Sequence, residues 1–151
     1  MASRASDLTA AAAAACAKAY APYSGFHVGA AVRDEHGRIH AGCNVENAAY
    51  PNGICAETAA LAALVLAGGS RAVEAAVSGP GPGLVTPCGG CRQRLRELGS
   101  PGMPIHICDE TGALKRTFTL EELLPASFGP ENLGPDEDTD PDMGTGSRRR
   151  S

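Results

Sequence analysis

The chain has 151 residues, of which 43% are hydrophobic and 20% charged, and its formal net charge is −4. This length and composition fit one compact globular domain and exclude fibrous and membrane proteins. The acidic balance provides no positive field that would attract a nucleic-acid backbone, so we expect a small-molecule substrate rather than a nucleic acid.

The first half of the chain predicts a helix, a β-hairpin and a second helix. An alanine-rich run at 6–19 predicts a helix, which Pro22 prevents from continuing. Alternating apolar residues from 26 to 32 predict a strand, and after a turn at 34–37 a second extended run at 38–45 completes the hairpin. The small and apolar residues 55–66 predict a helix that is buried on most sides.

The second half alternates strands with helices. Strands are predicted at 72–77 and 105–108, and a helix at 88–98 lies between them. Thr119 and Glu122 match a capping box that opens a short helix at 120–124. The alternation implies a three-layer α/β/α sandwich in a domain of residues 1–133. Residues 134–151 are rich in Pro, Gly and acidic residues and end in an arginine cluster, so we expect this tail to be disordered.

The six cysteines could form disulfides or bind a metal, and the redox compartment decides between these alternatives. The longest apolar run near the start, residues 10–17, is too short for a membrane span and lacks a signal-peptide pattern, so we expect a cytoplasmic protein. Thiols stay reduced in that compartment, which favours metal ligation or burial over disulfides. The six are Cys16, Cys43, Cys55, Cys88, Cys91 and Cys108.

Two short motifs contain three of these cysteines. Cys88 and Cys91 form a Cys-x-x-Cys loop whose sulfurs reach one tetrahedral ion, although this spacing also fits a redox dithiol. Cys55 lies two residues before Glu57, at the start of the predicted helix 55–66. Both motifs begin helices, so the positive ends of two helix dipoles should lower the thiol pKa values toward the thiolate that zinc requires.

Three thiolates leave the fourth tetrahedral position of a zinc ion for water, as in catalytic zinc sites. Cys16, Cys43 and Cys108 lie in helix or strand patterns, so we interpret them as core residues, with a fourth ligand as the alternative for each. The pattern predicts a catalytic Zn²⁺ site.

Several motifs in order resemble the homotetrameric, zinc-dependent cytidine deaminases, between about Ala19 and Leu133. They are APYSGFHVGAA at 21–31, GCNVENAAY at 42–50, CAE at 55–57 and PCGGCRQ at 87–93. The resemblance implies a mixed central sheet, Zn²⁺ ligands at Cys55, Cys88 and Cys91, and hydrolytic deamination of cytidine and deoxycytidine to uridine and deoxyuridine in pyrimidine salvage.

The resemblance also implies roles in substrate binding. It places Phe26 beside the pyrimidine, and it assigns Asn44 and Glu46 to the sugar hydroxyls and Ala56 to the substrate. Phe128 is implied to contact the base in a neighbouring subunit, which makes the protein a homotetramer with shared active sites. From the residues alone, Phe26 could be a core aromatic, and Asn44 and Glu46 could be polar residues at a strand end.

Glu57 is the candidate catalytic residue. Cytosine C4 is a poor electrophile and neutral water a poor nucleophile, so the reaction needs a metal to activate water and an acid to protonate N3. We expect Glu57 to accept the proton of the water, deliver it to N3 and help protonate the leaving amino group. The alternative is a first-turn residue that only stabilises the helix dipole.

One position departs from the family pattern. Family members commonly carry Arg directly after Cys-Ala-Glu, where it hydrogen-bonds the ligand sulfurs, and this chain has Thr58. Zinc with three thiolates carries a formal charge of −1, so less compensation predicts a weaker Lewis acid and a higher pKa for the zinc water. The helix N-termini or another donor such as Arg92 could take over.

Two other interpretations fit parts of the pattern. Blasticidin-type aminonucleoside deaminases have similar metal motifs, but Asn44-Val45-Glu46 argues for ordinary nucleosides. A structural-zinc or nucleic-acid-binding module could use the Cys-x-x-Cys and the terminal arginines. The acidic net charge, the position of Glu57 and the count of three thiols argue against that module.

Overall fold

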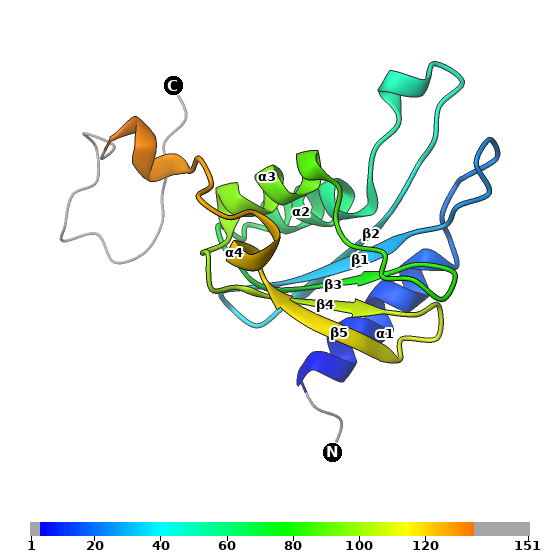
Figure 1. The fold of residues 1–151 in the computed structure, drawn as a ribbon, viewed down its shortest axis with the longest axis horizontal. Coiled ribbons are helices and arrows are strands. Elements are labelled where there is room, and N and C mark those ends of the chain that lie inside the picture. The colour runs from blue at the N-terminus through cyan, green and yellow to red at the C-terminus, as the bar shows by residue number, and fades with distance from the viewer. Residues whose placement is uncertain (1–3, 135–151) are drawn as a thin grey trace.

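A computed structural model describes residues 4–134 of the chain. Its centre is a five-stranded sheet in the order β2-β1-β3-β4-β5 (Figure 1). β3 and β4 run parallel and the other neighbouring pairs run antiparallel, so the sheet is mixed, as predicted. The strands are β1 (Gly29–Asp34), β2 (Ile39–Cys43), β3 (Ala72–Ser78), β4 (Pro104–Cys108) and β5 (Leu114–Thr119).

Helices cover both faces of this sheet. α1 packs on one face, against β1 and β3, while α2 packs against β2 and β1 from the other face, with α3 beside it (Figure 1). The three-layer α/β/α sandwich is therefore confirmed. The α-helices are α1 (Arg4–Cys16), α2 (Ala56–Leu66), α3 (Gly89–Leu98) and α4 (Leu120–Leu123), and the 3₁₀ turns are η1 (Tyr50–Asn52) and η2 (Pro130–Leu133).

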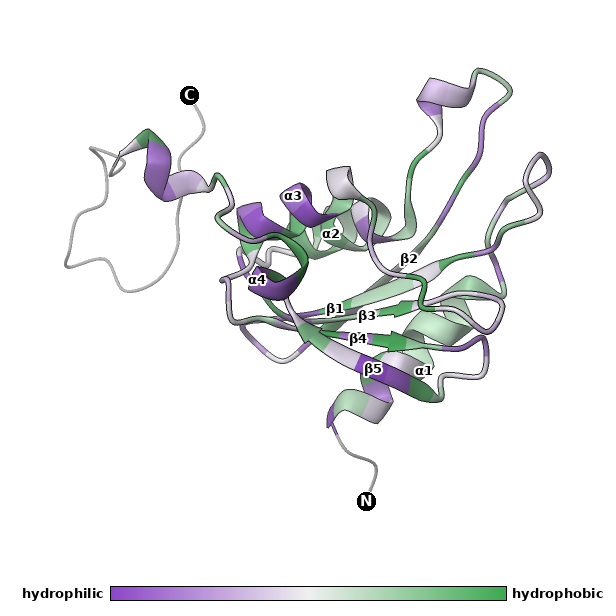
Figure 2. Ribbon diagram, in the orientation of Figure 1, coloured by the Kyte–Doolittle hydropathy of each residue, from purple (hydrophilic) through white to green (hydrophobic). Residues whose placement is uncertain are grey.

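The core lies in two layers because successive residues of a strand point to opposite faces. Val32, Val77 and Ile105 belong to the larger cluster, under α2 and α3, whereas Ala31 and Ala76 pack against α1. The central strands are hydrophobic and β5 carries hydrophilic residues (Figure 2). β1 and β3 are thus buried on both faces, which explains their nearly continuous apolar sequences.

Two glycines let the helices lie directly on the sheet. A Cβ at Gly29 would lie 2.0 Å from the Ala12 carbonyl oxygen of α1. One at Gly42 would lie 2.5 Å from the Ala60 backbone nitrogen of α2. Both contacts are far inside van der Waals distance, and the groups they meet are backbone that cannot move aside. Gly42 therefore allows the first turn of α2, which carries Glu57 and follows Cys55, to pack directly on β2.

Both antiparallel hairpins close through the same Asp-Glu-x-Gly turn. The carboxylate of Asp34 accepts hydrogen bonds from the backbone N–H groups two and four residues later, and so does that of Asp109. Gly37 and Gly112 follow with φ of 84° and 86°, a conformation that favours glycine. The second hairpin contains β5, a strand that was not predicted.

The remaining elements match the predictions with shifted ends. The first helix ends at Cys16 rather than about residue 19, and residues 26–28 precede β1 rather than belong to it. The Thr119 hydroxyl accepts a hydrogen bond from the Glu122 N–H, the helix cap that was predicted. No helix within residues 4–134 has the length and apolarity to cross a membrane. The predicted disordered tail lies outside the described residues, apart from Gly134.

Candidate active site

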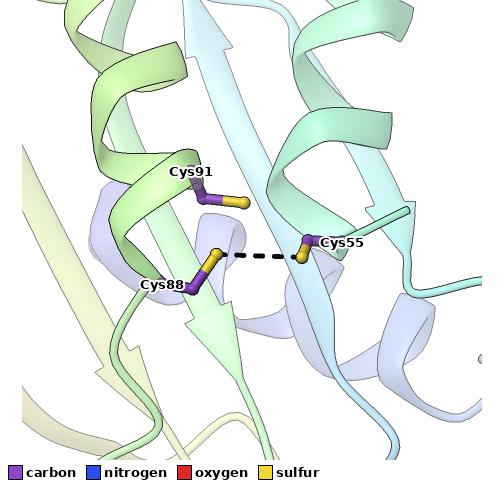
Figure 3. Close-up of side chains that lie close together, drawn as sticks. All are labelled: Cys55, Cys88 and Cys91. Carbon is purple, nitrogen blue, oxygen red and sulfur yellow. Dashed lines mark hydrogen bonds between the residues drawn. The ribbon is translucent and has the colours of Figure 1, made fainter. Parts of the chain in front are cut away.

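Three cysteine sulfurs converge where α2 and α3 begin. Cys55 is the N-cap of α2, Cys88 is the N-cap of α3 and Cys91 lies in the first turn of α3. The side chains point toward one another, with Cys55 Sγ and Cys88 Sγ 3.9 Å apart and all three sulfurs within 4.8 Å (Figure 3). Zinc–sulfur bonds of about 2.3 Å in a tetrahedron separate sulfurs by about 3.8 Å. The donor set and its spacing therefore fit one tetrahedral metal ion.

The three thiols differ in charge environment. The backbone N–H of Cys91 donates to the Cys88 sulfur and lowers the pKa of Cys88. Burial raises the pKa of Cys55, and the nearby Cys88 adds to the effect. Burial also raises the pKa of Cys91, with a contribution from the Glu57 charge. The predicted lowering of the thiol pKa thus holds for Cys88 alone, because burial raises the pKa of the other two thiols.

The other cysteines stay apart from this cluster. Cys16 and Cys108 are buried on the α1 side of the sheet, where their thiols donate to the His27 and Val77 carbonyl groups. Cys43 is half-buried. Among residues 4–134, the trio is the one group of three or more ligand-type side chains close enough to share an ion. The interpretation of these cysteines as core residues fits the buried Cys16 and Cys108 better than the half-buried Cys43.

Glu57 lies next to the cluster, in the first turn of α2. Its side chain is buried, and burial raises the pKa of the carboxyl group, against smaller opposing hydrogen bonds from its own backbone and from Cys91. Among the residues the structure describes, no arginine, lysine or histidine forms an ion pair with it. A carboxyl group in this setting is suited to holding a proton and releasing it.

A cleft of about 500 Å³ opens beside Cys55. It lies between the segment before β1 and the connection from β2 to α2, which project together from one end of the sheet (Figure 1). Backbone hydrogen bonds join the two segments, from Tyr20 N to Asn44 O and from Glu46 N to Tyr20 O. The lining residues are Tyr23, Ser24, Asn44, Val45, Glu46, Asn47, Tyr50, Gly53, Ile54 and Cys55.

Asn44 and Glu46 line this cleft and also hold its wall in place. The Asn44 amide accepts from the Val28 N–H and donates to the Phe26 carbonyl group, both at 2.8 Å. Glu46 accepts from the hydroxyl and N–H of Ser24 and from the Tyr23 N–H. Both side chains therefore order residues 23–28, a role that the sequence did not reveal.

Phe26 and Phe128, the two aromatic residues predicted to contact the base, are not among the residues that line the cleft. Phe26 is 45% exposed, and Phe128 is 57% exposed on the segment after α4. Ala56 is wholly buried between Cys55 and Glu57.

Two cleft residues were missed as candidates. Tyr23 and Tyr50 form an edge-to-face pair with ring centroids 5.9 Å apart. Both lie in the motifs at 21–31 and 42–50, and a search of those motifs for further aromatic residues would have identified them.

Comparisons with known proteins agree with this geometry. Residues 2–107 match the family model described as the cytidine and deoxycytidylate deaminase zinc-binding region. The chain belongs to this deaminase family. It is 41% identical to the cytidine deaminase of Sporosarcina psychrophila over 116 residues, which cover 77% of this chain and 85% of that one. It is 44% identical to that of Mycobacterium tuberculosis over 120 residues, 79% of this chain and 85% of the other.

Solved structures of the deaminase family share the fold. The crystal structure of the cytidine deaminase from Burkholderia pseudomallei superposes with a TM-score of 0.75 at 43% identity, covering 81% of this chain and 97% of that one. For the enzyme from Mycobacterium leprae the TM-score is 0.69 at 41% identity, covering 79% and 95%. Nearly the whole length of these smaller deaminases is thus represented in the chain.

This deaminase-family member has no arginine against the sulfurs at the position after Glu57. The suggested substitute, Arg92, is engaged elsewhere, since its guanidinium donates to the carbonyl groups of Pro87 and Leu123 and to the Thr86 hydroxyl. Arg92 therefore holds the loop before α3 against α4. Thr58 reaches a cluster sulfur from this position, with its hydroxyl oxygen 3.6 Å from Cys91 Sγ.

Proposed function

We propose that this protein is a zinc-dependent hydrolase that deaminates cytidine and deoxycytidine to uridine and deoxyuridine with release of ammonia. The observation that carries the proposal is the buried carboxyl group of Glu57 beside a three-thiol cluster, whose Cys55 lines a cleft of about 500 Å³. This volume is in the range of small-molecule sites. The assigned reaction consumes one water and exchanges the C4 amino group for an oxygen.

Cys55, Cys88 and Cys91 would hold the zinc ion. Three sulfur ligands leave the fourth position open, as catalytic zinc sites require. When bound, zinc supplies Lewis-acid activation of the attacking water. The donor set supports this assignment, because thiolates select soft or borderline metals over magnesium and calcium.

Glu57 would move the protons. It accepts a proton from the water that attacks C4 and delivers that proton to N3 of the ring. It then transfers the proton of the C4 hydroxyl group formed by the attack to the exocyclic nitrogen, which leaves as ammonia as its bond to C4 breaks and the C4 carbonyl group forms. A buried carboxyl group with a raised pKa matches this task, since it exchanges protons with weakly basic ring atoms more readily than an exposed one.

The cleft would bind the nucleoside. Asn44 and Glu46, which line the cleft, offer amide and carboxylate groups suited to sugar hydroxyls. The family resemblance assigns Phe26 and Ala56, which lie outside the lining, to the base. The hydrogen bonds that these polar groups make to residues 23–28 support the assignment, because they fix the groups before a ligand arrives. We place the protein in the cytoplasm, where thiols stay reduced and can bind the metal. We assign its reaction to pyrimidine salvage.

A homotetramer is part of the proposal. The outer face of α2 and α3 is apolar and hollowed, with Val65 46% and Leu66 89% exposed. Phe128 is also exposed, and Gln93 of α3 holds its backbone carbonyl group by a 2.9 Å hydrogen bond. An exposed ring outside its own cleft is available to a neighbouring subunit. Exposed patches of this kind commonly mark subunit contacts.

An assay of the pure protein with cytidine, deoxycytidine and blasticidin S tests the reaction. Loss of the cytosine absorbance together with stoichiometric ammonia is expected for the first two compounds. Turnover of blasticidin S alone would replace the proposal with the aminonucleoside alternative. Absence of turnover in protein that carries its metal would overturn the proposal.

Metal analysis tests the ligands. We expect about one zinc per chain, and Cys55→Ala, Cys88→Ala and Cys91→Ala should each lose it because each removes one of three thiolates. Cys108→Ala is the matched control, since this buried thiol lies outside the cluster, and it should keep its zinc. Full zinc occupancy in all three cluster variants would contradict the ligand assignment.

Subunit mixing tests the shared site. Phe26→Ala and Phe128→Ala should each be weakly active, the first through its own cleft and the second through a neighbour's. Mixing the two under subunit exchange should recover activity, because some sites then receive both rings. Proven exchange without recovery would show that the active sites are not shared.

A further inference from the structure

Thr58 follows Glu57 in the first turn of α2, and its hydroxyl group lies against the cysteine cluster. Its oxygen is 3.6 Å from Cys91 Sγ, and the side chain is half-buried. In the described part of the chain, Cys91 Sγ is the hydrogen-bond partner of this hydroxyl group, and Thr58 is not among the cleft-lining residues. The hydroxyl group is thus directed at the sulfur, and the same side chain also lines the hollow on the outer face of α2 and α3.

The metal state decides the direction of this hydrogen bond. With a free thiol, either the hydroxyl group or the S–H group could donate. A sulfur that binds a metal is a thiolate and has no proton to give. In the loaded site the Thr58 hydroxyl group must therefore be the donor and Cys91 Sγ the acceptor.

Cys91 is the cysteine that most needs such a donor. It is wholly buried, whereas Cys88 is exposed and accepts the backbone N–H of Cys91. Glu57 adds a second acidic group beside Cys91, and the nearby Arg92 is engaged by carbonyl groups. Three thiolates and a divalent ion leave one net negative charge, and a buried charge is costly unless it is hydrogen-bonded.

We propose that Thr58 is a positioning residue of the metal centre, whose hydroxyl group donates a hydrogen bond to the Cys91 thiolate and stabilises the bound metal. The inference rests on the proposed function through the assignment of the three cysteines as metal ligands. Valine has the shape of threonine without the donor, and serine keeps the donor without the methyl group. These two replacements separate hydrogen bonding from packing.

The test compares wild type, Thr58→Val and Thr58→Ser by cobalt spectroscopy and zinc competition. A thiolate that loses a hydrogen bond donates more electron density to the metal. The sulfur-to-Co²⁺ charge-transfer band of Thr58→Val should therefore shift to longer wavelength. Zinc competition against a chromogenic chelator should show affinity about 10-fold weaker, the size typical of a lost partner of a metal ligand. Thr58→Ser should restore both properties.

The alternative outcomes are separable. A Thr58→Val protein that matches wild type in band position and zinc affinity would overturn the inference. Equal weakening in the valine and serine variants, with an unshifted band, would assign Thr58 to packing and overturn it as well. Wild-type protein that binds neither Co²⁺ nor Zn²⁺ would instead refute the metal assignment of the proposed function. Circular dichroism of the metal-free variants checks that both fold.

Discussion

Two buried carboxyl groups, Glu57 at the cysteine cluster and Asp34 at the β1–β2 turn, are 5% and 0% exposed but have opposite environments. Asp34 accepts hydrogen bonds from the backbone N–H groups of His36 and Arg38 and from the side chains of Arg38 and His40. Burial alone would raise the pKa of Asp34, but these donors hold it far below its usual value. At Glu57 burial prevails and the pKa rises.

The contrast assigns a stabilising role to Asp34 and a catalytic role to Glu57. A fully partnered carboxylate is fixed in its ionised form and contributes to stability. A buried carboxyl group without a cation partner destabilises the fold at neutral pH, which is a cost that active sites tolerate. Substitution at Glu57 should therefore change turnover without loss of stability, and substitution at Asp34 should do the reverse.

The largest effect is expected for Glu57→Gln. The amide keeps the shape of the side chain but cannot accept and return a proton, so kcat should fall by about 10⁴-fold, the upper end for a general acid–base group. The thermal midpoint and the zinc content should be unchanged or higher. Steady-state kinetics, calorimetry and metal analysis measure these three quantities.

Glu122→Gln is the matched control, because Glu122 also lies in the first turn of a helix but is exposed. It should keep wild-type turnover. A Glu57→Gln protein that retained more than about a tenth of wild-type kcat would reduce Glu57 to a residue that stabilises the helix start, and the proton transfers would need another carrier.

Asp34→Ala should have the largest effect on stability. Removal of one partner from a buried ion pair typically costs about 3 to 5 kcal/mol. We expect the lower end, because the Arg38 side chain is 46% exposed and can return to water. Denaturant unfolding measures the loss, and kcat of the folded fraction should stay near wild type.

Asp109→Ala is the control for Asp34→Ala. Asp109 closes the β4–β5 hairpin with the same backbone hydrogen bonds, but it is half-buried and has no histidine partner within the described residues. Its replacement should be clearly milder. Equal losses at the two turns would show that turn geometry, rather than the buried charge, carries the stability.

The two turns also show where sequence analysis fell short. Asp109-Glu110-Thr111-Gly112 repeats the pattern Asp34-Glu35-His36-Gly37, yet β5 was missed while β2 was predicted. β5 lies at the sheet edge, and Lys115, Arg116 and the threonines interrupt the apolar alternation on which strand prediction relies. The repeated turn was the available signal, because an Asp-x-x-Gly turn after a strand favours a returning strand.

The chemical motifs were easier to predict than their surroundings. Cys55, Cys88 and Cys91 meet as expected from two motifs that each begin a helix, because these helices belong to the same layer. The hydrogen bonds of Asn44 and Glu46 to residues 23–28 join segments some 20 residues apart, which spacing alone does not reveal. The hydrogen bonds of Arg92 could not be predicted either, since its carbonyl partner at Leu123 is 31 residues away.

The smallest effect expected is a pH-dependent one at Glu35, next to Asp34. Burial would raise the pKa of Glu35, but hydrogen bonds from its own backbone, from Ser70 and from the Arg71 N–H lower it from 4.5 to about 2. A lowered pKa stabilises the fold above the unfolded-state value of 4.5, and the contribution disappears as the pH falls toward 2.

Glu35→Gln should therefore cost stability near neutral pH and progressively less in acid. Solvent screens this part-exposed carboxylate, so we expect about 1 kcal/mol at about pH 7. The difference in unfolding free energy between wild type and variant should shrink steadily below about pH 4.5. Urea unfolding at a series of pH values measures this curve. A constant difference would show that Glu35 contributes through shape rather than charge, and would confine the carboxylate effect to Asp34.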